Sequence, residues 1–176
     1  MRGRSAPGFF LLVALALLAS LFFLEDGETS AGDEPMAVLE DFYAAVAAGD
    51  VARAREHLLL PVDEERMNEL SIDLETTVRD MSSGEVSARV CEERLRGDWA
   101  MVVTRFERRL PGEPPEVHLM RVMLVRRDGA WKVTFAGVLD DPALELSGEE
   151  DRLELERRFD SDLGNLHQLY DVPQAR

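Results

Sequence analysis

Apolar positions from residue 36 onward follow the spacing of helices. The first stripe, with one residue every three or four positions, consists of Val38, Leu39, Phe42 and Val46. It predicts a helix over 36–48, because Pro35 suits a first helical turn and Gly49 a helix end. Asp50 is a favourable N-terminal cap, so we expect a second helix over 51–60 and hence a helical hairpin.

Residues 63–83 carry a weaker pattern that leaves two interpretations open. The apolar stripe in this segment consists of Met67, Leu70, Leu74 and Val78. Its spacing favours a third helix, whereas the β-branched residues favour a short strand near 72–78.

After Gly84 the apolar period changes from that of a helix to that of strands. The predicted strands are Val86–Cys91, Trp99–Leu110, Val117–Arg127 and Trp131–Leu139. Asp128-Gly129 between the last two is a strong signal for a hairpin. Helical spacing returns over 148–170, with a stripe of Leu155, Phe159, Leu163, Leu166 and Tyr170.

This order of elements predicts an α+β fold, in which helices pack on a strongly curved antiparallel sheet. We expect a linker over 25–34, the α+β domain over 35–141, and an acidic, amphipathic helical extension over 142–176. Three roles are open for the extension. It closes the mouth of the cone, packs on the outer face of the sheet, or binds a protein partner.

The N-terminal segment predicts export. Residues 9–24 form an unbroken apolar run, preceded by Arg2 and Arg4 and followed by acidic residues. That asymmetry indicates that the chain beyond the run is translocated. A helix of this length spans roughly 24 Å, between a signal-peptide core and a membrane span. We therefore expect a domain anchored through residues 9–24 on the periplasmic or extracytoplasmic side, or a secreted domain if cleavage occurs near Ala31.

Charge and cysteine content restrict the classes of partner and cofactor. The formal net charge is −15, which opposes binding to nucleic-acid phosphates. Cys91 is the single cysteine of the sequence, so neither an intrachain disulfide nor a thiolate metal cluster is expected. His57 and His118 lack a third ligand at a suitable spacing, and no phosphate-binding loop is evident. We expect neither a metal nor a cofactor.

Two stretches resemble a known superfamily. "LEDFYAAVAAGDVARAREHL" at 39–58 is similar to the opening helices of nuclear transport factor 2-like (NTF2-like) proteins, and "RRDGAWKVTFAG" at 126–137 resembles their last hairpin. The resemblance covers roughly residues 36–140 and implies a cone-shaped α+β fold. The superfamily includes ketosteroid isomerase-like and polyketide cyclase-like enzymes, non-catalytic binding modules, and membrane-anchored periplasmic domains of secretion machinery. The fold alone therefore assigns no activity.

The residues that an isomerase of this kind uses are not matched. Aligned on Gly49-Asp50, the position of the isomerase tyrosine holds Phe42, and the position of its base holds Arg66. Tyr43 is adjacent to the former position, but one residue along a helix turns a side chain by about 100°. We therefore expect a non-enzymatic binding or accessory module of the cell envelope, for a protein partner or a small ligand. The alternatives are an isomerase- or cyclase-like enzyme acting on a small apolar molecule, and a structural subunit of an envelope complex.

The candidate ligand contacts are Arg105, Arg121, Trp131 and Tyr43. If Leu110 lies opposite Glu116, Arg105 faces Arg121, and the pair predicts a clamp for an anion inside the cone. The alternative is an outer face on which Glu107 and other acids neutralise both. The hairpin turn decides between them, because a two-residue turn directs Arg121 away from Trp131 and a three-residue turn places it beside Phe135.

Overall fold

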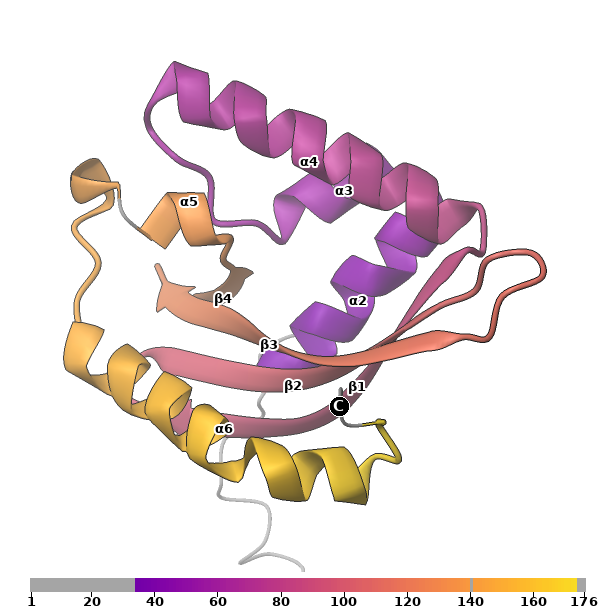
Figure 1. The fold of residues 1–176 in the computed structure, drawn as a ribbon. Helices are drawn as coiled ribbons and strands as arrows, with labels where there is room; N and C mark the ends of the chain where they lie inside the picture. The colour runs from indigo at the N-terminus through magenta and orange to yellow at the C-terminus, as the bar shows by residue number, and fades with distance from the viewer. Residues whose placement is uncertain (1–33, 140, 174–176) are drawn as a thin grey trace, which may run out of the picture. The chain divides into compact units, whose positions relative to one another are not determined.

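The computed structural model describes residues 34–139 and 141–173, and the helices come first (Figure 1). They are α2 (Pro35–Ala47), α3 (Val51–Glu56) and α4 (Glu64–Ser82). Aspartates cap two of them: Asp50 accepts the Arg53 N–H at 3.0 Å, and Asp63 accepts the Arg66 N–H at 3.0 Å. The strand alternative near 72–78 is wrong, because α4 is continuous through that segment.

The sheet has the order β1-β2-β3-β4 and is antiparallel throughout. Its strands are β1 (Val86–Arg96), β2 (Trp99–Arg108), β3 (Glu116–Arg127) and β4 (Ala130–Val133). The β1–β2 register shifts by one residue between Val90 and Glu92, a bulge that bends the strand. The sheet curves around α2, so that an inner and an outer face are distinct (Figure 1). The predicted α+β class is confirmed.

The hairpin between β3 and β4 has a two-residue turn. Arg127 lies opposite Ala130, and Asp128 and Gly129 have φ values of 53° and 82°. Positive φ at both central residues is what a type I′ turn requires, and its twist matches that of the strands. The three-residue alternative is wrong.

The second predicted helix and the last predicted strand are shorter than expected, and one pair of backbone hydrogen bonds accounts for both. The second helix ends at Glu56 rather than at 60, and β4 ends at Val133 rather than at 139. The Val133 N–H donates to the His57 carbonyl at 2.8 Å, and the Leu59 N–H donates to the Val133 carbonyl at 2.9 Å. Residues 57–59 thus leave the helix to cover the edge of β4. Beyond β4 the chain forms a short helix, α5 (Ala136–Leu139), and a 3₁₀ turn (Pro142–Leu144).

Alternation along β2 separates the two faces of the sheet. Ala100, Val102 and Thr104 lie on the inner face with α2, whereas Trp99, Met101 and Val103 lie on the outer face. All six side chains are buried. The core therefore has two layers, one on each side of the sheet.

The outer layer is completed by the C-terminal helix, α6 (Glu149–Leu169). Leu155, Phe159 and Leu166 of its apolar stripe are buried, and α6 contacts β1, β2 and β3. Of the three roles considered for this segment, packing on the outer face is the one observed, and α6 does not close the mouth of the cone.

No helix within 34–139 or 141–173 is both long and apolar enough to cross a membrane. The predicted anchor or signal segment at 9–24, the predicted cleavage near Ala31 and most of the predicted linker lie outside the described residues.

Candidate functional site

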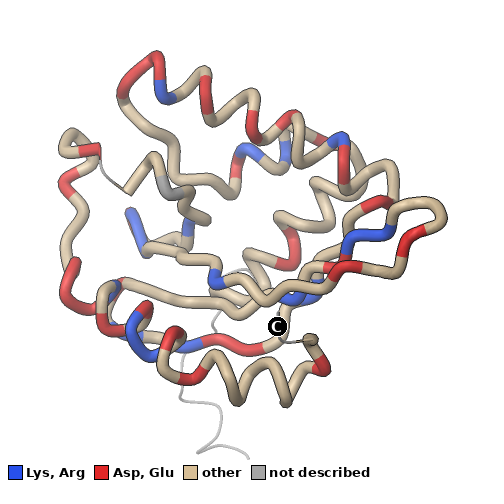
Figure 2. Tube along the Cα trace, in the orientation of Figure 1, with Lys and Arg blue, Asp and Glu red and all other residues tan. Residues whose placement is uncertain are grey.

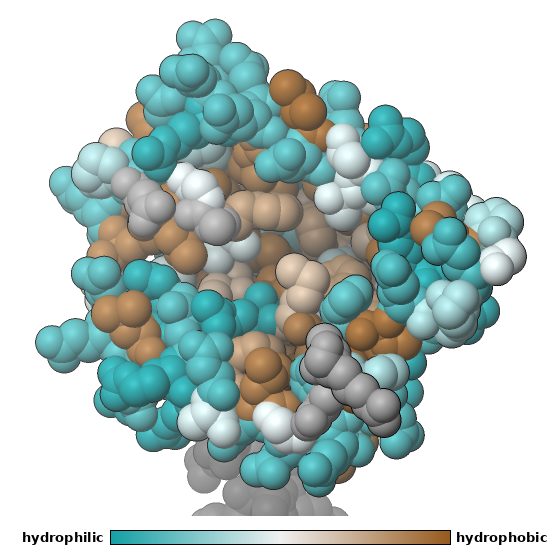
Figure 3. Space-filling model, viewed as in Figure 1, coloured by the Kyte–Doolittle hydropathy of each residue, from teal (hydrophilic) through white to brown (hydrophobic). Residues whose placement is uncertain are grey.

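The inner face of the sheet borders a cavity of about 520 Å³. This volume lies within the range of roughly 300–1,000 Å³ that is typical of ligand sites. Figure 3 shows the hollow, with hydrophobic side chains inside and hydrophilic ones around it. The apolar part of its lining consists of Phe42, Phe106, Met120, Val122, Met123, Val133, Phe135 and Leu139.

Hydroxyl groups supply the polar part of the wall. Tyr43, Thr77 and Thr134 line the cavity. The Tyr43 ring packs edge-on against Phe106, with 5.7 Å between ring centroids. Burial raises the pKa of Tyr43 well above its ordinary value, and the neighbouring Thr104 hydroxyl opposes this by less. Tyr43 therefore stays neutral near pH 7 and is able to donate a hydrogen bond.

Thr104 is the one fully buried polar residue of this face within the described part of the chain. Its Oγ1 has no hydrogen-bond partner among the described residues. Burying a hydroxyl without a hydrogen-bond partner costs free energy, because the group loses its hydrogen bonds to water and gains none in the protein. Of these two neighbouring hydroxyls, that of Tyr43 belongs to a residue of the cavity wall, whereas Thr104 is fully buried and is not part of the lining.

The charged residues that reach the cavity stand at its rim and are paired. Arg121 Nη1 donates to Asp160 Oδ1 of α6 at 2.7 Å, and its guanidinium lies 5.8 Å from the Phe159 ring centroid. Glu156 accepts from Arg152 Nη1 at 2.8 Å. These pairs belong to the border between the β3 edge and α6, so neither charge projects alone into the cavity.

The register on which the proposed arginine clamp depends is wrong. Arg108, not Leu110, lies opposite Glu116, because the chain leaves the β2–β3 ladder two residues earlier than assumed. Arg105 consequently faces Leu119, and Arg121 faces Val103.

Arg105 and Arg121 both lie on the outer face, where carboxylates neutralise them. Arg105 Nη1 donates to Glu107 Oε2 at 2.8 Å. The two guanidinium–carboxylate pairs thus match the alternative interpretation, in which acids on the outer face compensate the arginines.

The four candidate ligand contacts are thus divided among different places. Tyr43 lies in the cavity wall, and Arg121 lies at the rim. Arg105 lies on the outer face, and Trp131 is buried in the core with Arg126 over its ring at 5.8 Å. The structure brings Tyr43 and Arg121 to the same cavity but does not bring all four candidates together.

Other titratable candidates have structural partners. Arg66, at the position aligned with the isomerase base, donates to the Gly137 carbonyl at 2.7 Å. Asp141 is buried and accepts the N–H groups of Ala143 and Val62, both at 3.0 Å. These bonds hold the pKa of Asp141 below its usual value. Both residues therefore brace the segment around α5.

The histidines do not form a site either. Burial lowers the pKa of His57, whose backbone belongs to the bridge with β4. His118 is an exposed residue opposite Phe106. Among the described residues, no group of three His, Cys, Asp or Glu side chains is arranged to hold a metal ion.

Several cavity residues were not identified from the sequence. Phe106 and Met120 belong to the inner face by alternation, but the sequence does not show which face borders a cavity. Thr77 lies outside the buried stripe of α4, and no sequence signal identified it. Phe135 was predicted on a strand and instead lies past the end of β4, where it contributes to the cavity wall.

Comparisons with known proteins find likenesses only among solved structures. No protein-family model matches the chain, and a search of the curated proteins finds no match. An NTF2-like transpeptidase from Campylobacter jejuni is 16% identical with a TM-score of 0.45, over 58% of this chain and 98% of that one. A SEC-C motif containing protein from Rhodopseudomonas palustris is 24% identical with a TM-score of 0.45, over 61% of this chain and 80% of that one.

A third solved structure is an NTF2-like protein with a cystatin-like fold from Novosphingobium aromaticivorans. It is 19% identical with a TM-score of 0.39, over 73% of this chain and 94% of that one. Two of these three similar structures are thus described as NTF2-like. At these identities and TM-scores the likeness identifies no activity, and the fold class rests on the topology of the chain itself.

Proposed function

We propose that this protein is a membrane-anchored, exported member of the NTF2-like superfamily that binds an apolar group in its cone without transforming it. The observation that carries the proposal is the cavity of about 520 Å³, with an aromatic and aliphatic wall and neutral hydroxyls as its interior polar groups. Apolar ligand surface buried against this wall leaves water, which is favourable. The Tyr43 hydroxyl is the group that orients a polar ligand atom, since the Thr77 and Thr134 hydroxyls already donate to the Asp73 and Met123 carbonyls.

The lining favours binding over catalysis. Proton abstraction needs a carboxylate or imidazole that faces the substrate and has a suitable pKa. The carboxylate at this cavity, Glu156, lies at the rim and is held by Arg152. Tyr43 is a donor whose raised pKa makes it a poor base near pH 7. An isomerase- or cyclase-like activity is the second candidate, and the neutral hydroxyl of Tyr43 in the cavity wall is the feature that favours it.

The test uses indole, a neutral and water-soluble aromatic molecule, as the probe. The full-length chain, labelled with ¹³C at methionine methyl groups, is placed in phosphatidylcholine nanodiscs and titrated while its methyl resonances are recorded. Met120 lines the cavity, whereas Met36 lies at the start of α2 beside Glu93. We expect the Met120 methyl to shift saturably and the Met36 methyl to stay in place.

A cavity-filling substitution provides the matched control. Thr77→Trp places a large ring in the cavity, and Ile72→Trp places the same ring on the exposed side of α4, where Ile72 is 64% exposed. Thr77→Trp is expected to abolish the indole-dependent shift, and Ile72→Trp to leave it unchanged. An equal response in the two variants would contradict a binding role for this cavity.

The anchor and export form a separate part of the proposal, supported by the charge asymmetry around residues 9–24. In membranes of an expressing cell, we expect the chain to resist alkaline extraction and to retain Met1. A soluble mature chain that begins near Ala31 would instead identify a cleaved signal peptide.

A further inference from the structure

The mouth of the cavity is bordered by an unpaired strand edge. β4 pairs only with Leu124–Arg127, although β3 begins at Glu116. Residues 116–122 of β3 therefore have no strand partner on that edge within the described part of the chain. At about 3.4 Å per residue the free edge is roughly 24 Å long, enough for a strand of five or six residues.

The free edge presents regularly spaced backbone groups. The Met123 carbonyl accepts from the Thr134 N–H at 2.9 Å, so Met123 directs its backbone groups toward β4 and away from β2. Residues two apart on an antiparallel strand point the same way, which places the N–H and C=O of Val117, Leu119 and Arg121 on the free edge. Such an edge is a template for a further strand.

A strand added at this edge brings alternate side chains to the cavity. Met120, Arg121 and Val122 of β3 line it, so the cavity begins at the edge itself. One side chain in two of an added strand therefore faces Phe106 and Phe135, and the others face α6. The residue that faces the cavity and the residues two positions away from it point to the same side, toward α4. An apolar residue with basic residues two positions away therefore fits this alternation.

Charge around the mouth favours a basic partner. Glu69 and Asp73 are exposed on α4, and together with Arg66 they line a smaller cavity that shares Phe135 with the main one. Because Arg66 donates to the neutral Gly137 carbonyl, the three side chains leave one net negative charge there. On the other side Arg121 is matched by Asp160 and Arg152 by Glu156, so the arginines on that side carry no surplus. Figure 2 shows acidic positions along α4 and α6. The formal net charge of −15 adds a long-range attraction for cations.

We propose that the cone binds an extended segment of a partner protein, paired with β3 over residues 116–122, with an apolar side chain in the cavity and lysine or arginine two positions away on the same side. This inference rests on the proposed binding function and names its partner. Backbone hydrogen bonds supply affinity, the cavity selects the apolar side chain, and the acidic rim selects the basic neighbours.

The test uses an acetylated heptapeptide with a central phenylalanine, lysine two positions away on either side, and threonine at the other four positions. The full-length chain in phosphatidylcholine nanodiscs is titrated, with empty nanodiscs as the blank. We expect saturable binding, slower hydrogen exchange at the Leu119 amide and a shift of the Met120 methyl. The same peptide with glutamate in place of lysine is expected not to bind, and equal binding of the two peptides would overturn the proposal.

Substitutions at Leu119 separate the edge from the side chain. Leu119→Pro removes the N–H that faces the free edge, and Leu119→Ala removes the same side chain but keeps that N–H. We expect Leu119→Pro to bind the peptide about tenfold more weakly than Leu119→Ala. An unchanged Met101 methyl resonance, from the buried outer layer, verifies that both variants are folded. Equal affinities of the two variants would overturn the pairing with β3.

Two further results complete the test. Glu69→Gln combined with Asp73→Asn is expected to weaken peptide binding about fivefold while leaving the indole response unchanged. If the full-length chain instead dimerises through the free edge, and Leu119→Pro abolishes that dimer, the partner is a second copy and the proposal is wrong. If indole shifts the Met120 methyl but the peptide does not bind, this inference fails alone; if neither ligand binds, the proposed function fails with it.

Discussion

The two faces of the sheet differ in how completely helices cover them. On the outer face α6 covers Trp99, Met101 and Val103, each at most 1% exposed. On the inner face α2 and α4 cover the sheet incompletely, and a cavity of about 520 Å³ remains beside Met120 and Phe135. The amphipathic helix α6 covers the outer face and leaves the inner face open.

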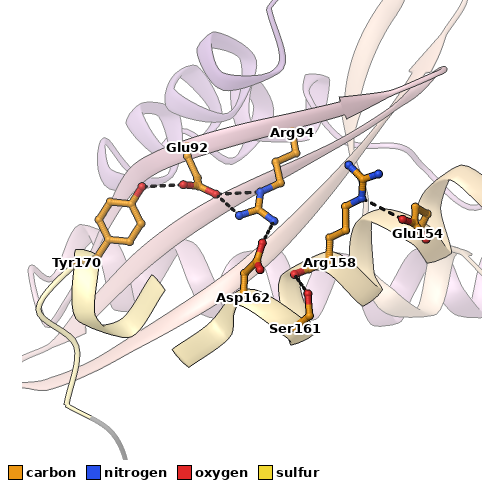
Figure 4. Close-up of polar contacts among 7 residues, drawn as sticks. All are labelled: Glu92, Arg94, Glu154, Arg158, Ser161, Asp162 and Tyr170. Atoms are coloured by element: carbon orange, nitrogen blue, oxygen red, sulfur yellow. Dashed lines mark hydrogen bonds and ion pairs between the residues drawn. The ribbon is translucent and has the colours of Figure 1, made fainter. Parts of the chain in front are cut away.

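The difference also extends to the polar groups. On the outer face, ion pairs join the strands to α6. Figure 4 shows the cluster of these pairs around Arg94. The inner face holds a buried Thr104 hydroxyl without a partner and a neutral Tyr43. A buried polar atom without a partner occurs on both sides, because His167 Nδ1 of α6 has none either. The contrast therefore rests on close packing at the outer face and open space at the inner one, which is the basis of the proposed binding site.

The strongest test of the outer face is Phe159→Ala. Phe159 is 5% exposed and packs between the sheet and the Arg121 guanidinium. Its removal leaves a hole that the surrounding layer fills only in part, so we expect a loss of about 3–5 kcal/mol in the free energy of unfolding, measured by urea denaturation. Leu153→Ala, at a position 42% exposed on the same helix, is the control and is expected to cost less. Equal losses would mean that α6 is not a structural layer.

A second test adds volume to each face. Val103 is fully buried under α6, so Val103→Leu is expected to lower the free energy of unfolding by about 1–3 kcal/mol. Thr77 borders open space in the cavity, so Thr77→Leu is expected to change the free energy of unfolding by less than about 0.5 kcal/mol. Thermal denaturation of the two variants measures the difference. A large cost at Thr77 would show that the cavity has no room for a ligand.

Arg94 tests the contribution of the outer ion pairs. Its guanidinium donates to Glu92 and Asp162, both at 2.8 Å, and thereby joins β1 to α6 (Figure 4). Because Asp162 is 45% exposed, solvent screens the pair, and we expect Arg94→Met to cost only about 0.5–1 kcal/mol. The loss should shrink in 1 M NaCl.

The control for Arg94 is Arg79→Met, which removes a largely exposed arginine paired with Asp80 at 3.4 Å. We expect no measurable change in its urea midpoint. A loss at Arg94 that high salt leaves intact would assign the effect to packing of the side chain rather than to its charge.

The last expected effect is a pH dependence at Tyr170, which appears only in alkali. Burial, together with the hydrogen bond from its hydroxyl to Glu92 at 3.1 Å, raises the pKa of Tyr170 to about 12 from its ordinary value of 10.0. Because the folded pKa is the higher one, this contribution to stability is complete below pH 10 and is lost as the pH rises through 12. The Tyr170→Phe variant should therefore have a lower free energy of unfolding than wild type near pH 8, and the two free energies should converge in alkali. Denaturation measured near pH 8 and in alkali tests this. A constant difference across that range would contradict the assignment.

Sequence periodicity predicted the types and order of the elements better than their ends. The stripe ending in Val46 and the stripe through Leu155 and Phe159 each became helices with those residues buried. The second helix and the last strand were predicted too long, because the bridge between residues 57–59 and Val133 stops both. Such a bridge joins segments about 75 positions apart and leaves no local pattern in either.

The candidate site shows the same limit. Tyr43 was identified because it stands on a helix beside the position of a known catalytic residue. The arginine clamp failed because the predicted loop was two residues too short on the β2 side, and Arg105 therefore met Leu119. A shift of register changes every cross-strand partner at once. Phe106 and Met120 were missed for another reason: a two-residue shift leaves both on the same face, but the sequence does not show that this face borders a cavity.

By itself, the sequence determined the α+β class, the helix cap at Asp50, and the Asp128-Gly129 hairpin. Each follows from interactions within a few residues, such as a side chain bonding a nearby N–H or a backbone adopting positive φ. Only the tertiary structure decided that α6 covers the outer face, that Arg121 turns toward Asp160, and that β3 keeps a free edge beside an open cavity. Those outcomes depend on which surfaces distant segments bury together, and that choice is made by the packing of the whole sheet.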